Sequence, residues 1–402
     1  MKTLLAGKKI LFGICGSIAA YKAAEWVREL VKAEAEVSVV MTEAATHFVS
    51  GLTFASLSGR RVYTGMFEKD AGEEMTHITL ARECDLFVIA PATAQTIAKL
   101  AHGFADDLLS VLVLAGNTKV LVFPAMNSNM YCHKATQANL FKLQEYGYTV
   151  IEPEQGKLAC GDDGVGRLVD WKTAREKIVS VFTRQDLQGQ TVLISAGPTW
   201  ESYDPARLLS NRSSGKMGYA LARVAKRRGA RVILVSGPSA IDPPPGVEMI
   251  NVMTGIEMHD AILAKYESAD IVVMAAAVSD YRPGKKMKQK VKKSGTSIEL
   301  ELIPNPDILK ILGYKKKKAI RPLLVGFAAE SKGHVEEGRR KLKEKNLDLI
   351  VINDIIGTDT GFGADTNEVS LIDRNYQLEK LPLRSKEECA EMIWDKIVNL
   401  NR

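Results

Sequence analysis

The chain starts an α/β domain twice, and this repetition constrains the fold more than any other feature. Apolar runs at Lys9–Ile14 and Thr191–Ile194 predict buried strands. A turn-rich segment follows each run, and helical periodicity then extends over residues 18–32 in one case and 217–228 in the other. Because strands and helices alternate, each half predicts a parallel sheet with right-handed crossovers.

The length of the chain accommodates both repeats as separate domains. With about 100–200 residues per domain, 402 residues allow two domains, each with its own core. A short polar linker is predicted at Thr183–Gly189. We therefore expect an α/β fold of two open, mostly parallel sheets in tandem, over residues 1–186 and 187–402. Further apolar runs predict strands at residues 37–41, 85–90, 119–123, 231–235, 270–276, 298–303, 323–327, 349–352 and 369–372.

The composition limits the functional classes. The 54 Lys and Arg residues against 48 Asp and Glu residues give a net charge of +6, which is too mild to indicate a nucleic-acid partner. The five cysteines lack the spacing of a zinc site, so we expect reduced thiols in a cytoplasmic protein. Residues 4–14 are too few and too interrupted for a signal peptide or a membrane span, and no other stretch qualifies.

Small and polar residues follow the predicted strands of the first half. In an open parallel sheet, the ligand binds at the carboxyl ends of the strands. A phosphate at a helix N-terminus would suit Gly16 and Ser17, and a tight turn with a serine cap is the alternative. Since the chain has no GxGxxG fingerprint, a mononucleotide fits better than a dinucleotide. The candidate cofactor-binding residues are Gly16, Ser17, Thr42, Thr93, Ala94, Gln95 and Thr96.

Three further residues of the first half are candidates for chemistry. His77 precedes a helical segment, Asn127 follows a predicted strand, and Cys160 lies in the glycine-rich segment 159–167. A loop of this kind could close over a ligand and deliver the thiol. Each residue also has an ordinary explanation, as a satisfied histidine, a turn asparagine and part of a surface loop.

The motifs around these residues resemble the flavin-dependent cysteine decarboxylases, in particular 4′-phosphopantothenoylcysteine decarboxylase. The resemblance extends over residues 6–182 and rests on His77, on PAMNSNM at 124–130 and on ACGDDGVGR at 159–167. It implies a flavodoxin-like or Rossmann-like flavoprotein domain that binds FMN. Two departures are visible: Thr-Ala-Gln-Thr at 93–96 replaces the Ser-Ala-Asn-Thr of many relatives, and Tyr131 replaces a tryptophan.

The resemblance also implies a mechanism. A carboxylate on an sp³ carbon leaves only if its electrons have a sink, and the flavin creates one by oxidising the cysteinyl side chain to a thioaldehyde. In this scheme His77 positions the substrate and assists proton movement, and Asn127 binds the substrate carboxylate. Cys160 donates a proton in the later reductive step, because a thiol with an unperturbed pKa of ~8.5 is mostly protonated at neutral pH.

Two groups of lysines stand out in the second half. The run RPGKKMKQKVKK at 282–293 is typical of a solvated, disordered segment, and it could instead deliver a lysine to a triphosphate. The run lacks the interleaved aromatic residues of a nucleic-acid site. Lys341 and Lys345 share one face of a predicted helix, where they form either a solvated surface or a clamp on phosphate oxygens. The chain has no Walker A motif.

Six motifs in order make the second half resemble the phosphopantothenate–cysteine ligases, over residues 187 to about 400. The resemblance implies a Rossmann-like domain that activates the carboxylate of 4′-phosphopantothenate with CTP. The acyl-cytidylate then reacts with the amine of cysteine. The motifs are AGPT at 196–199, NRSSGKMG at 211–218, AAAVSDYR at 275–282, NPDI at 305–308, VGFAAE at 325–330 and the pair Lys341 and Lys345.

The ligase resemblance assigns roles to residues within these motifs. Asn211 contacts the acyl intermediate, and residues 213–218 hold phosphate at a helix N-terminus. Lys290 neutralises the developing charge, with Lys288 and Lys292 as close alternatives. Magnesium accompanies the triphosphate. The implied CTP-binding residues are Asp280, Lys290, Asn305, Pro306, Asp307, Ile308, Phe327, Lys341 and Lys345.

Together, the two halves resemble the bifunctional proteins of bacterial coenzyme A biosynthesis. The implied substrates are 4′-phosphopantothenate, cysteine and CTP, with no nucleic-acid or membrane partner. The same resemblance implies a homo-oligomer, a dodecamer in which decarboxylase domains form trimers and ligase domains form dimers. Two other hypotheses are a non-catalytic flavin-binding regulator, which the joint presence of His77, Asn127 and Cys160 disfavours, and a nucleic-acid-associated protein, which the mild charge disfavours.

Overall fold

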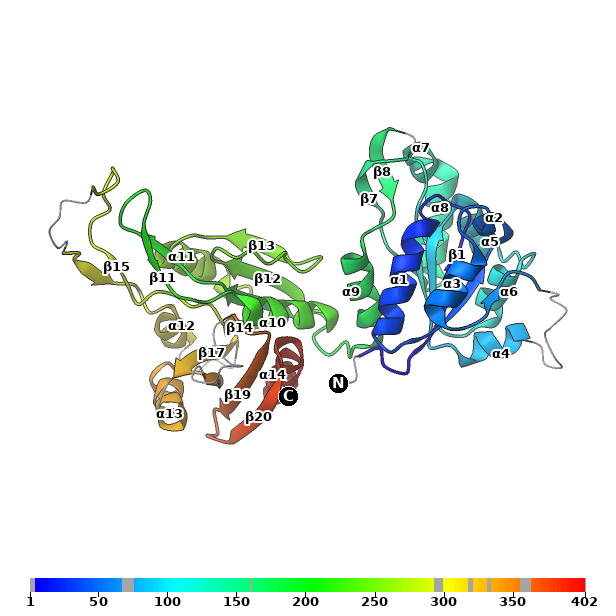
Figure 1. Cartoon of the computed structure of the whole chain (residues 1–402). Helices are drawn as coiled ribbons and strands as arrows, with labels where there is room; N and C mark the ends of the chain where they lie inside the picture. The colour runs from blue at the N-terminus through cyan, green and yellow to red at the C-terminus, as the bar shows by residue number, and fades with distance from the viewer. Residues whose placement is uncertain are drawn as a thin grey trace. The chain divides into compact units, whose positions relative to one another are not determined.

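The computed structural model describes seven stretches of the chain and divides it into two compact units (Figure 1). The units are Met1–Thr183 and Arg184–Arg402. The stretches described are residues 4–66, 76–159, 161–292, 299–316, 321–330, 334–354 and 363–401.

The first unit is built on a parallel sheet. Its strands are β1 (Lys9–Ile14), β2 (Glu36–Met41), β3 (Val62–Tyr63), β4 (Leu86–Ala92), β5 (Lys119–Pro124) and β6 (Thr149–Val150). They lie in the order β3-β2-β1-β4-β5-β6, and each neighbouring pair is parallel. This is the doubly wound order. The first strand lies at the centre of the sheet, β2 and β3 are added on one side of it, and β4 to β6 are added on the other side.

Helices cover both faces of this sheet, because alternate strand residues point to opposite faces and both sets are apolar. In β1, Phe12 and Ile14 belong to the core on one face, whereas Leu11 belongs to the core on the other. The first face is covered by α1 (Ala20–Lys32), α3 (Gly51–Ser58) and α9 (Trp171–Phe182). The second is covered by α4 (Thr76–Glu83), α5 (Ala94–His102), α6 (Leu108–Ala115) and α8 (Lys134–Glu145). The short helices α2 (Glu43–Thr46) and α7 (Ser128–Cys132) follow strand ends.

A two-stranded hairpin lies where the sequence predicted a glycine-rich loop. Its strands, β7 (Glu154–Lys157) and β8 (Asp163–Arg167), pair antiparallel. The prediction of a loop over residues 159–167 is therefore wrong for the part that forms β8. Gly164 and Gly166 suit this strand, because other chain atoms lie where their Cβ atoms would be.

The second unit repeats the doubly wound order. Its main strands are β9 (Thr191–Ala196), β12 (Arg231–Ser236), β13 (Glu248–Asn251), β14 (Ile271–Met274), β17 (Leu323–Glu330), β18 (Leu349–Asp354), β19 (Thr366–Asp373) and β20 (Leu378–Ser385). They lie in the order β13-β12-β9-β14-β17-β18-β19-β20. The pairs up to β18 are parallel, and the last two strands pair antiparallel. The expectation of two mostly parallel α/β sheets is confirmed, although the sequence missed β13 and β20.

Helices also cover both faces of the second sheet. One face carries α10 (Lys216–Arg227) and α14 (Lys386–Leu400), and the other carries α11 (Gly255–Tyr266), α12 (Ile308–Lys316) and α13 (His334–Glu344). A capping box starts α11: the Thr254 hydroxyl accepts from the backbone N of Glu257, whose carboxylate accepts from the backbone N of Thr254. Ile393, Trp394 and Ile397 recur at helical spacing on the buried face of α14, so this helix serves packing.

Two small antiparallel ribbons complete the second unit. β10 (Trp200–Ser202) pairs with β11 (Leu208–Ser210), and β15 (Tyr281–Pro283) pairs with β16 (Leu302–Pro304). β15 leads into the basic run 282–293. Disorder was one of the two expectations for this run from the sequence. Within that run, Met287 donates from its backbone N to the carbonyl oxygen of Tyr203, and Val291 donates to the Asp204 carboxylate. The described part of the run, residues 282–292, is therefore anchored to the turn after β10.

Residues 184–189 of the segment predicted as a polar linker belong to the second unit. Leu187 is fully buried, and the Asp186 carboxylate lies 2.6 Å from the guanidinium of Arg228, which is itself 2% exposed. Burial alone would raise the pKa of the Asp186 carboxyl, but the Arg228 guanidinium outweighs burial and holds that pKa below its usual value. This ion pair ties the start of the second unit to the end of α10.

Candidate active sites

The first unit has a cavity where its strand order reverses, and we call it the crevice cavity. Its volume is ≈ 630 Å³, within the ~300–1,000 Å³ range of small-molecule sites. All seven residues that the sequence proposed for a cofactor line this one cavity, because β1, β2 and β4 end side by side. The lining residues are Gly16, Ser17, Thr42, Glu43, Ala44, Thr93, Ala94, Gln95, Thr96, Lys99, Asp106, Asp107, Ala125, Met126 and Met130.

Two threonines organise the helix ends around the crevice cavity. Thr42 caps α2, because its hydroxyl accepts from the backbone N of Ala45. Thr93 caps α5 in the same way, by accepting from the backbone N of Thr96. The N-terminal turn of α5 therefore forms part of the cavity wall, where its backbone N–H groups favour an anion.

Gly16 and Ser17 lie in the turn before α1 rather than in its first turn. The sequence predicted a helix from residue 18, but α1 starts at Ala20, and the Ser17 hydroxyl accepts from the backbone N of Ala19. A Cβ at Gly16 would collide with the side chain of Ala44, so glycine lets α2 approach this turn. The sequence expected Gly16 at the N-terminus of this helix, but α1 starts four residues later. Gly16 nevertheless lines the cavity.

One cation and three carboxylates line the crevice cavity. The Lys99 ammonium lies 2.7 Å from the Asp107 carboxylate and 2.9 Å from that of Asp106, and Glu43 is the third acid. Burial would raise the pKa of Asp107, but hydrogen bonds from Lys99 and nearby groups lower it. Cys15 is fully buried, and burial raises the pKa of its thiol to about 11. The cavity wall thus contains Lys99 in ion pairs with Asp106 and Asp107. The nearby Cys15 thiol is neutral.

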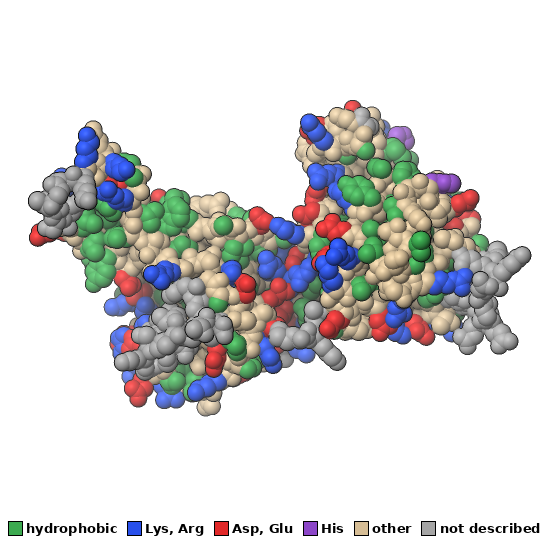
Figure 2. Space-filling model, in the orientation of Figure 1, with side chains coloured by type: hydrophobic (Ala, Val, Ile, Leu, Met, Phe, Trp, Pro, Cys, Tyr) green, Lys and Arg blue, Asp and Glu red, His purple; other side chains and the backbone are tan. Residues whose placement is uncertain are grey.

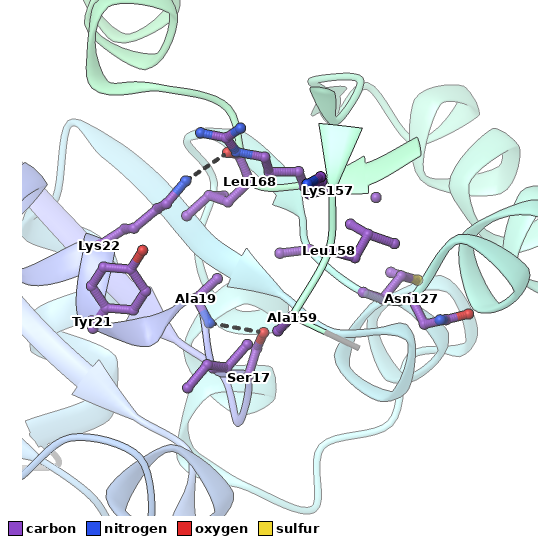
Figure 3. Close-up of a pocket in the computed structure, with 14 residues that line it drawn as sticks. Ser17, Ala19, Tyr21, Lys22, Asn127, Lys157, Leu158, Ala159 and Leu168 are labelled. Atoms are coloured by element: carbon purple, nitrogen blue, oxygen red, sulfur yellow. Dashed lines mark hydrogen bonds between the residues drawn. The ribbon is translucent and has the colours of Figure 1, made fainter. Parts of the chain in front are cut away.

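A second cavity of about 500 Å³ adjoins the first, with which it shares Ser17, Ala125 and Met126. We call it the hairpin cavity, because residues of β7, β8 and their connection form one wall (Figure 3). A ligand in one cavity therefore borders a ligand in the other. The lining residues are Ser17, Ile18, Ala19, Tyr21, Lys22, Ala125, Met126, Asn127, Lys157, Leu158, Ala159, Gly166, Arg167 and Leu168.

Two glycines let the hairpin lie against the segment after β5. A Cβ at Gly166 would collide with the carbonyl oxygen of Met126, and a Cβ at Gly164 would lie 2.6 Å from the hydroxyl oxygen of Ser128. The backbone N of Met126 also donates to the carbonyl oxygen of Gly166, at 3.0 Å. These contacts hold β8 beside Asn127, which lies between Met126 and Ser128.

Asn127 lies where the sequence predicted it, shortly after β5. Its Oδ1 accepts from the backbone N of Asn129 at 2.8 Å, so it caps α7. The residue also lines the hairpin cavity, and Figure 3 shows it on the opposite side of that cavity from Lys22. Asn127 is therefore both a turn residue and a cavity residue, and its two sequence interpretations are compatible.

The side chain of His77 and the whole of Cys160 lie outside the residues that the structure describes. His77 is the second residue of α4, and its side chain lies outside the described residues. Cys160 also lies outside them, in the connection between β7 and β8. The preceding residue, Ala159, lines the hairpin cavity, so the chain passes that cavity immediately before the thiol.

In the second unit, strand ends also meet where the strand order reverses. The backbone N of Ala277, after β14, donates to the carbonyl oxygen of Gly197, after β9. The Asn211 side chain donates from Nδ2 to the carbonyl oxygen of Ala277 at 2.9 Å. α10 starts at Lys216, after Gly215 in the left-handed conformation, and no described side chain caps it. Three of the six ligase-like motifs therefore meet at one edge of the sheet.

Several predicted CTP-binding residues form a connected group. The backbone N of Asn305 donates to the carbonyl oxygen of Asp280, and its Nδ2 donates to the carbonyl oxygen of Ser279. The Lys345 ammonium lies 2.9 Å from the carboxylate of Asp307, which precedes α12. The segment between these contacts brings the NPDI motif beside the end of β14. The group comprises Asp280, Asn305, Pro306, Asp307, Ile308 and Lys345.

The other predicted CTP-binding residues lie on other segments of the second unit. Lys290 is exposed and forms no hydrogen bond or ion pair within the described stretches. Lys341 lies on α13 with Glu337 3.9 Å away, and Phe327 lies partly buried on β17. Figure 2 shows basic side chains gathered over the ribbon that carries β15. Lys290 lies in the basic run that follows β15 in the chain.

Sequence reasoning missed several polar residues at both sites. Lys22, Lys157 and Arg167 line the hairpin cavity. The only local signal is that Lys157 precedes the glycine-rich segment 159–167 and that Arg167 is its last residue. Glu201 is 3% exposed and accepts from the backbone N of Gly255 and from Nδ2 of Asn305. No local pattern marks Glu201, because both donors are far away in the sequence.

The chain matches two family models, one over each half. The model described as DNA/pantothenate metabolism flavoprotein C-terminal domain matches residues 187–400, and the model described as Flavoprotein matches residues 1–183. The coenzyme A biosynthesis bifunctional protein CoaBC of Bacillus subtilis strain 168 is 44% identical over 403 residues, which cover 99% of this chain and 98% of that protein. The chain belongs to the CoaBC family.

The chain is also similar to a second full-length protein and to two solved structures. The CoaBC protein of Escherichia coli K12 is 43% identical over 398 residues, or 98% of this chain and 97% of that protein. A crystal structure of the C-terminal domain of a CoaBC protein is 41% identical and covers 54% of this chain and 97% of its own, with a TM-score of 0.46. A mutant PPC decarboxylase complexed with pantothenoylaminoethenethiol is 30% identical and covers 43% of this chain and 96% of its own, with a TM-score of 0.39. The full-length CoaBC relatives confirm the family that the motifs predicted.

Proposed function

We propose that this chain converts 4′-phosphopantothenate into 4′-phosphopantetheine in two steps. Residues 187–402 would ligate cysteine with CTP through an acyl-cytidylate, and residues 1–186 would then decarboxylate 4′-phosphopantothenoylcysteine with FMN. Membership of the CoaBC family supports a bifunctional enzyme of coenzyme A biosynthesis. One observation carries the site assignment: the seven residues proposed for the flavin line one cavity, and that cavity adjoins the one lined by Asn127.

FMN fits the crevice cavity. The cavity lies where doubly wound folds bind nucleotides, its ≈ 630 Å³ volume suits a ligand of this class, and the Flavoprotein family model covers this half. The N-terminal turn of α5 would face the anionic part of the cofactor. When bound, FMN would supply the two-electron oxidation that creates the electron sink for decarboxylation on the cysteinyl side chain. The residues that would hold it are Gly16, Ser17, Thr42, Thr93, Ala94, Gln95 and Thr96.

Three residues of the first unit would handle the substrate, and of these Asn127 lines the hairpin cavity. Asn127 would hydrogen-bond the substrate carboxylate and fix its orientation. His77 would position the reacting group and assist proton movement. Cys160 would hold the proton for the reductive step, and the contacts of β8 with Met126 would keep the hairpin beside the substrate.

The second unit would supply the acyl-transfer groups. Asn211, held at the carbonyl oxygen of Ala277, would contact the acyl intermediate. Residues 213–218 would hold a phosphate at the start of α10, where no described side chain occupies the first backbone N–H groups. Lys290 would neutralise negative charge that develops on the reacting phosphate.

We assign the CTP site to the group around Asn305. Lys345 would exchange its ion pair with Asp307 for the triphosphate, and Lys341 would join it there. Within the described stretches, no three His, Cys, Asp or Glu side chains form a cluster that could hold a metal ion. Magnesium would enter with the triphosphate, and the exposed carboxylate of Asp280 suits a single protein ligand. The assigned residues are Asp280, Lys290, Asn305, Pro306, Asp307, Ile308, Phe327, Lys341 and Lys345.

Assembly and location are proposed from the family resemblance. We propose a homo-oligomer, a dodecamer in the family pattern, in the cytoplasm. Among the described helices, none combines the length and the apolar character needed to cross a membrane. The position of Asn127 on the wall of a cavity supports an enzyme over a non-catalytic flavin-binding regulator.

One incubation tests the proposed function. The purified protein is mixed with 4′-phosphopantothenate, cysteine, CTP and magnesium, and the products are identified by mass analysis. We expect a yellow protein that releases pyrophosphate and carbon dioxide and forms 4′-phosphopantetheine. A colourless protein, or a flavin-bound protein that forms no product, would contradict the proposal.

We expect His77→Asn to remove decarboxylation and to spare ligation. Decarboxylation should fall by about 10²-fold, because a substrate that loses its positioning group leaves the reactive geometry. The chain forms two compact units, and the motifs of the two activities do not interleave. Phosphopantothenoylcysteine should therefore accumulate, as measured by mass analysis. Loss of ligation as well, in a folded variant that retains flavin, would show that the two activities are coupled.

We also expect Gly166→Ala to impair decarboxylation, by about 10-fold or more. The added methyl would collide with the carbonyl oxygen of Met126, and the φ of Gly166, +144°, is one that L residues rarely adopt. β8 must then move away from Asn127. The matched control is Gly161→Ala, which adds a methyl at another positive φ in the same hairpin where no atom lies within 4 Å. Equal turnover by the two variants would show that the contact of β8 with Met126 does not matter for decarboxylation.

A further inference from the structure

Among the residues that the structure describes, three cations and no carboxylate line the hairpin cavity. Lys22 comes from α1, Lys157 from β7 and Arg167 from β8. The neighbouring crevice cavity has the opposite balance, with Lys99 and three carboxylates. The role proposed for Asn127 accounts for only one negative group of the substrate, its carboxylate. The three cations therefore indicate a second anionic group in the same cavity.

The surroundings of Lys22 support an anionic ligand. Its ammonium is partly buried and donates to the carbonyl oxygen of Leu168 at 3.4 Å. Burial, and then the nearby guanidinium of Arg167, lower the pKa of Lys22. The carboxylates of Glu154, Asp170 and Glu25 oppose this shift in part, and none of them is among the lining residues described. Glu154 lies 3.9 Å from Arg167. An anion between Lys22 and Arg167 would relieve their repulsion and replace the water that they lose.

The geometry separates Lys22 from Asn127. Figure 3 shows Lys22 and Asn127 on opposite sides of the cavity, with Leu158 and Ala159 of the hairpin connection between them. 4′-Phosphopantothenoylcysteine carries its carboxylate at one end and its phosphate at the other. A substrate that places its carboxylate at Asn127 would therefore extend its phosphate towards Lys22.

We propose that Lys22, Lys157 and Arg167 form the phosphate subsite of the decarboxylase and set its selectivity for phosphorylated substrates. This inference rests on the proposed decarboxylation. A phosphate between these side chains would link α1 to both strands of the hairpin, since each cation can donate a charge-assisted hydrogen bond.

A pair of substrates tests this subsite with the full-length, flavin-bound protein. We compare kcat/KM for 4′-phosphopantothenoylcysteine with kcat/KM for pantothenoylcysteine, which lacks the phosphate. Lys22→Gln and Lys157→Gln should each lower the ratio of the two values by about 10- to 100-fold, because each loses a charge-assisted bond to phosphate. Lys22→Arg keeps the charge and should retain most of the ratio. Lys32→Gln removes an exposed lysine from the same helix, outside the cavity, and should keep the wild-type ratio.

Binding of the products gives a readout that does not depend on turnover. Calorimetry should show that Lys22→Gln weakens binding of 4′-phosphopantetheine by the same factor and changes binding of pantetheine far less. Equal losses for the phosphorylated and unphosphorylated compounds would overturn the phosphate subsite. Failure of the wild-type protein to decarboxylate either substrate would instead contradict the proposed function. Variants are compared at equal flavin content, so that a misfolded variant is recognised.

Discussion

Cys160→Ala should release carbon dioxide from 4′-phosphopantothenoylcysteine but stall before 4′-phosphopantetheine. The proton held by the thiol is needed only in the reductive step, and loss of a positioned proton donor costs about 10²–10⁴-fold in rate. An oxidised enethiol product should therefore accumulate, and the flavin absorbance should stay bleached. Mass analysis of quenched reactions, together with absorbance, measures both effects.

Cys132→Ala is the matched control for this variant. Cys132 is an exposed free thiol at the end of α7 and lines neither cavity. Its substitution should leave decarboxylation at the wild-type rate. A normal yield of 4′-phosphopantetheine from Cys160→Ala would mean that another group donates the proton, and that the hairpin connection has only a structural role.

The two sheets were predictable because their central strands are buried on both faces. Such strands read as continuous apolar runs between turns, as β4 and β14 do. β20 was missed because its residues are mostly exposed, with Leu381 as its one buried side chain. The hairpin of β7 and β8 was missed because its sequence is polar and rich in glycine, and its packing against Met126 is a long-range contact.

The walls of the crevice cavity were predictable for a different reason. The carboxyl ends of neighbouring parallel strands meet at one edge, so residues 16–17, 42 and 93–96 must lie together once the strand order is known. The cations of the hairpin cavity follow no such rule. Lys22 of α1 and Arg167 of β8 line the same cavity although they are far apart in the sequence. Local periodicity contains no information about such a long-range approach.

Lys290 and Lys292 offer a matched pair for testing the ligase half. Both side chains are exposed, and they flank Val291. The backbone N of Val291 donates to the Asp204 carboxylate at 3.1 Å, and its carbonyl oxygen accepts from Arg207 at 3.1 Å. One anchored segment therefore carries both lysines, and the two substitutions remove equal charge at nearly the same place.

Lys290→Gln should lower acyl-cytidylate formation by about 10²–10³-fold, because a positioned cation stabilises charge that appears only as the phosphate reacts. Lys292→Gln should change it little. Pyrophosphate release from CTP and 4′-phosphopantothenate without cysteine isolates this step, and flavin content and decarboxylation should stay unchanged in both variants. Equal and slight losses from both substitutions would mean that the basic run acts only as a diffuse positive field, and such losses would fade as salt is added.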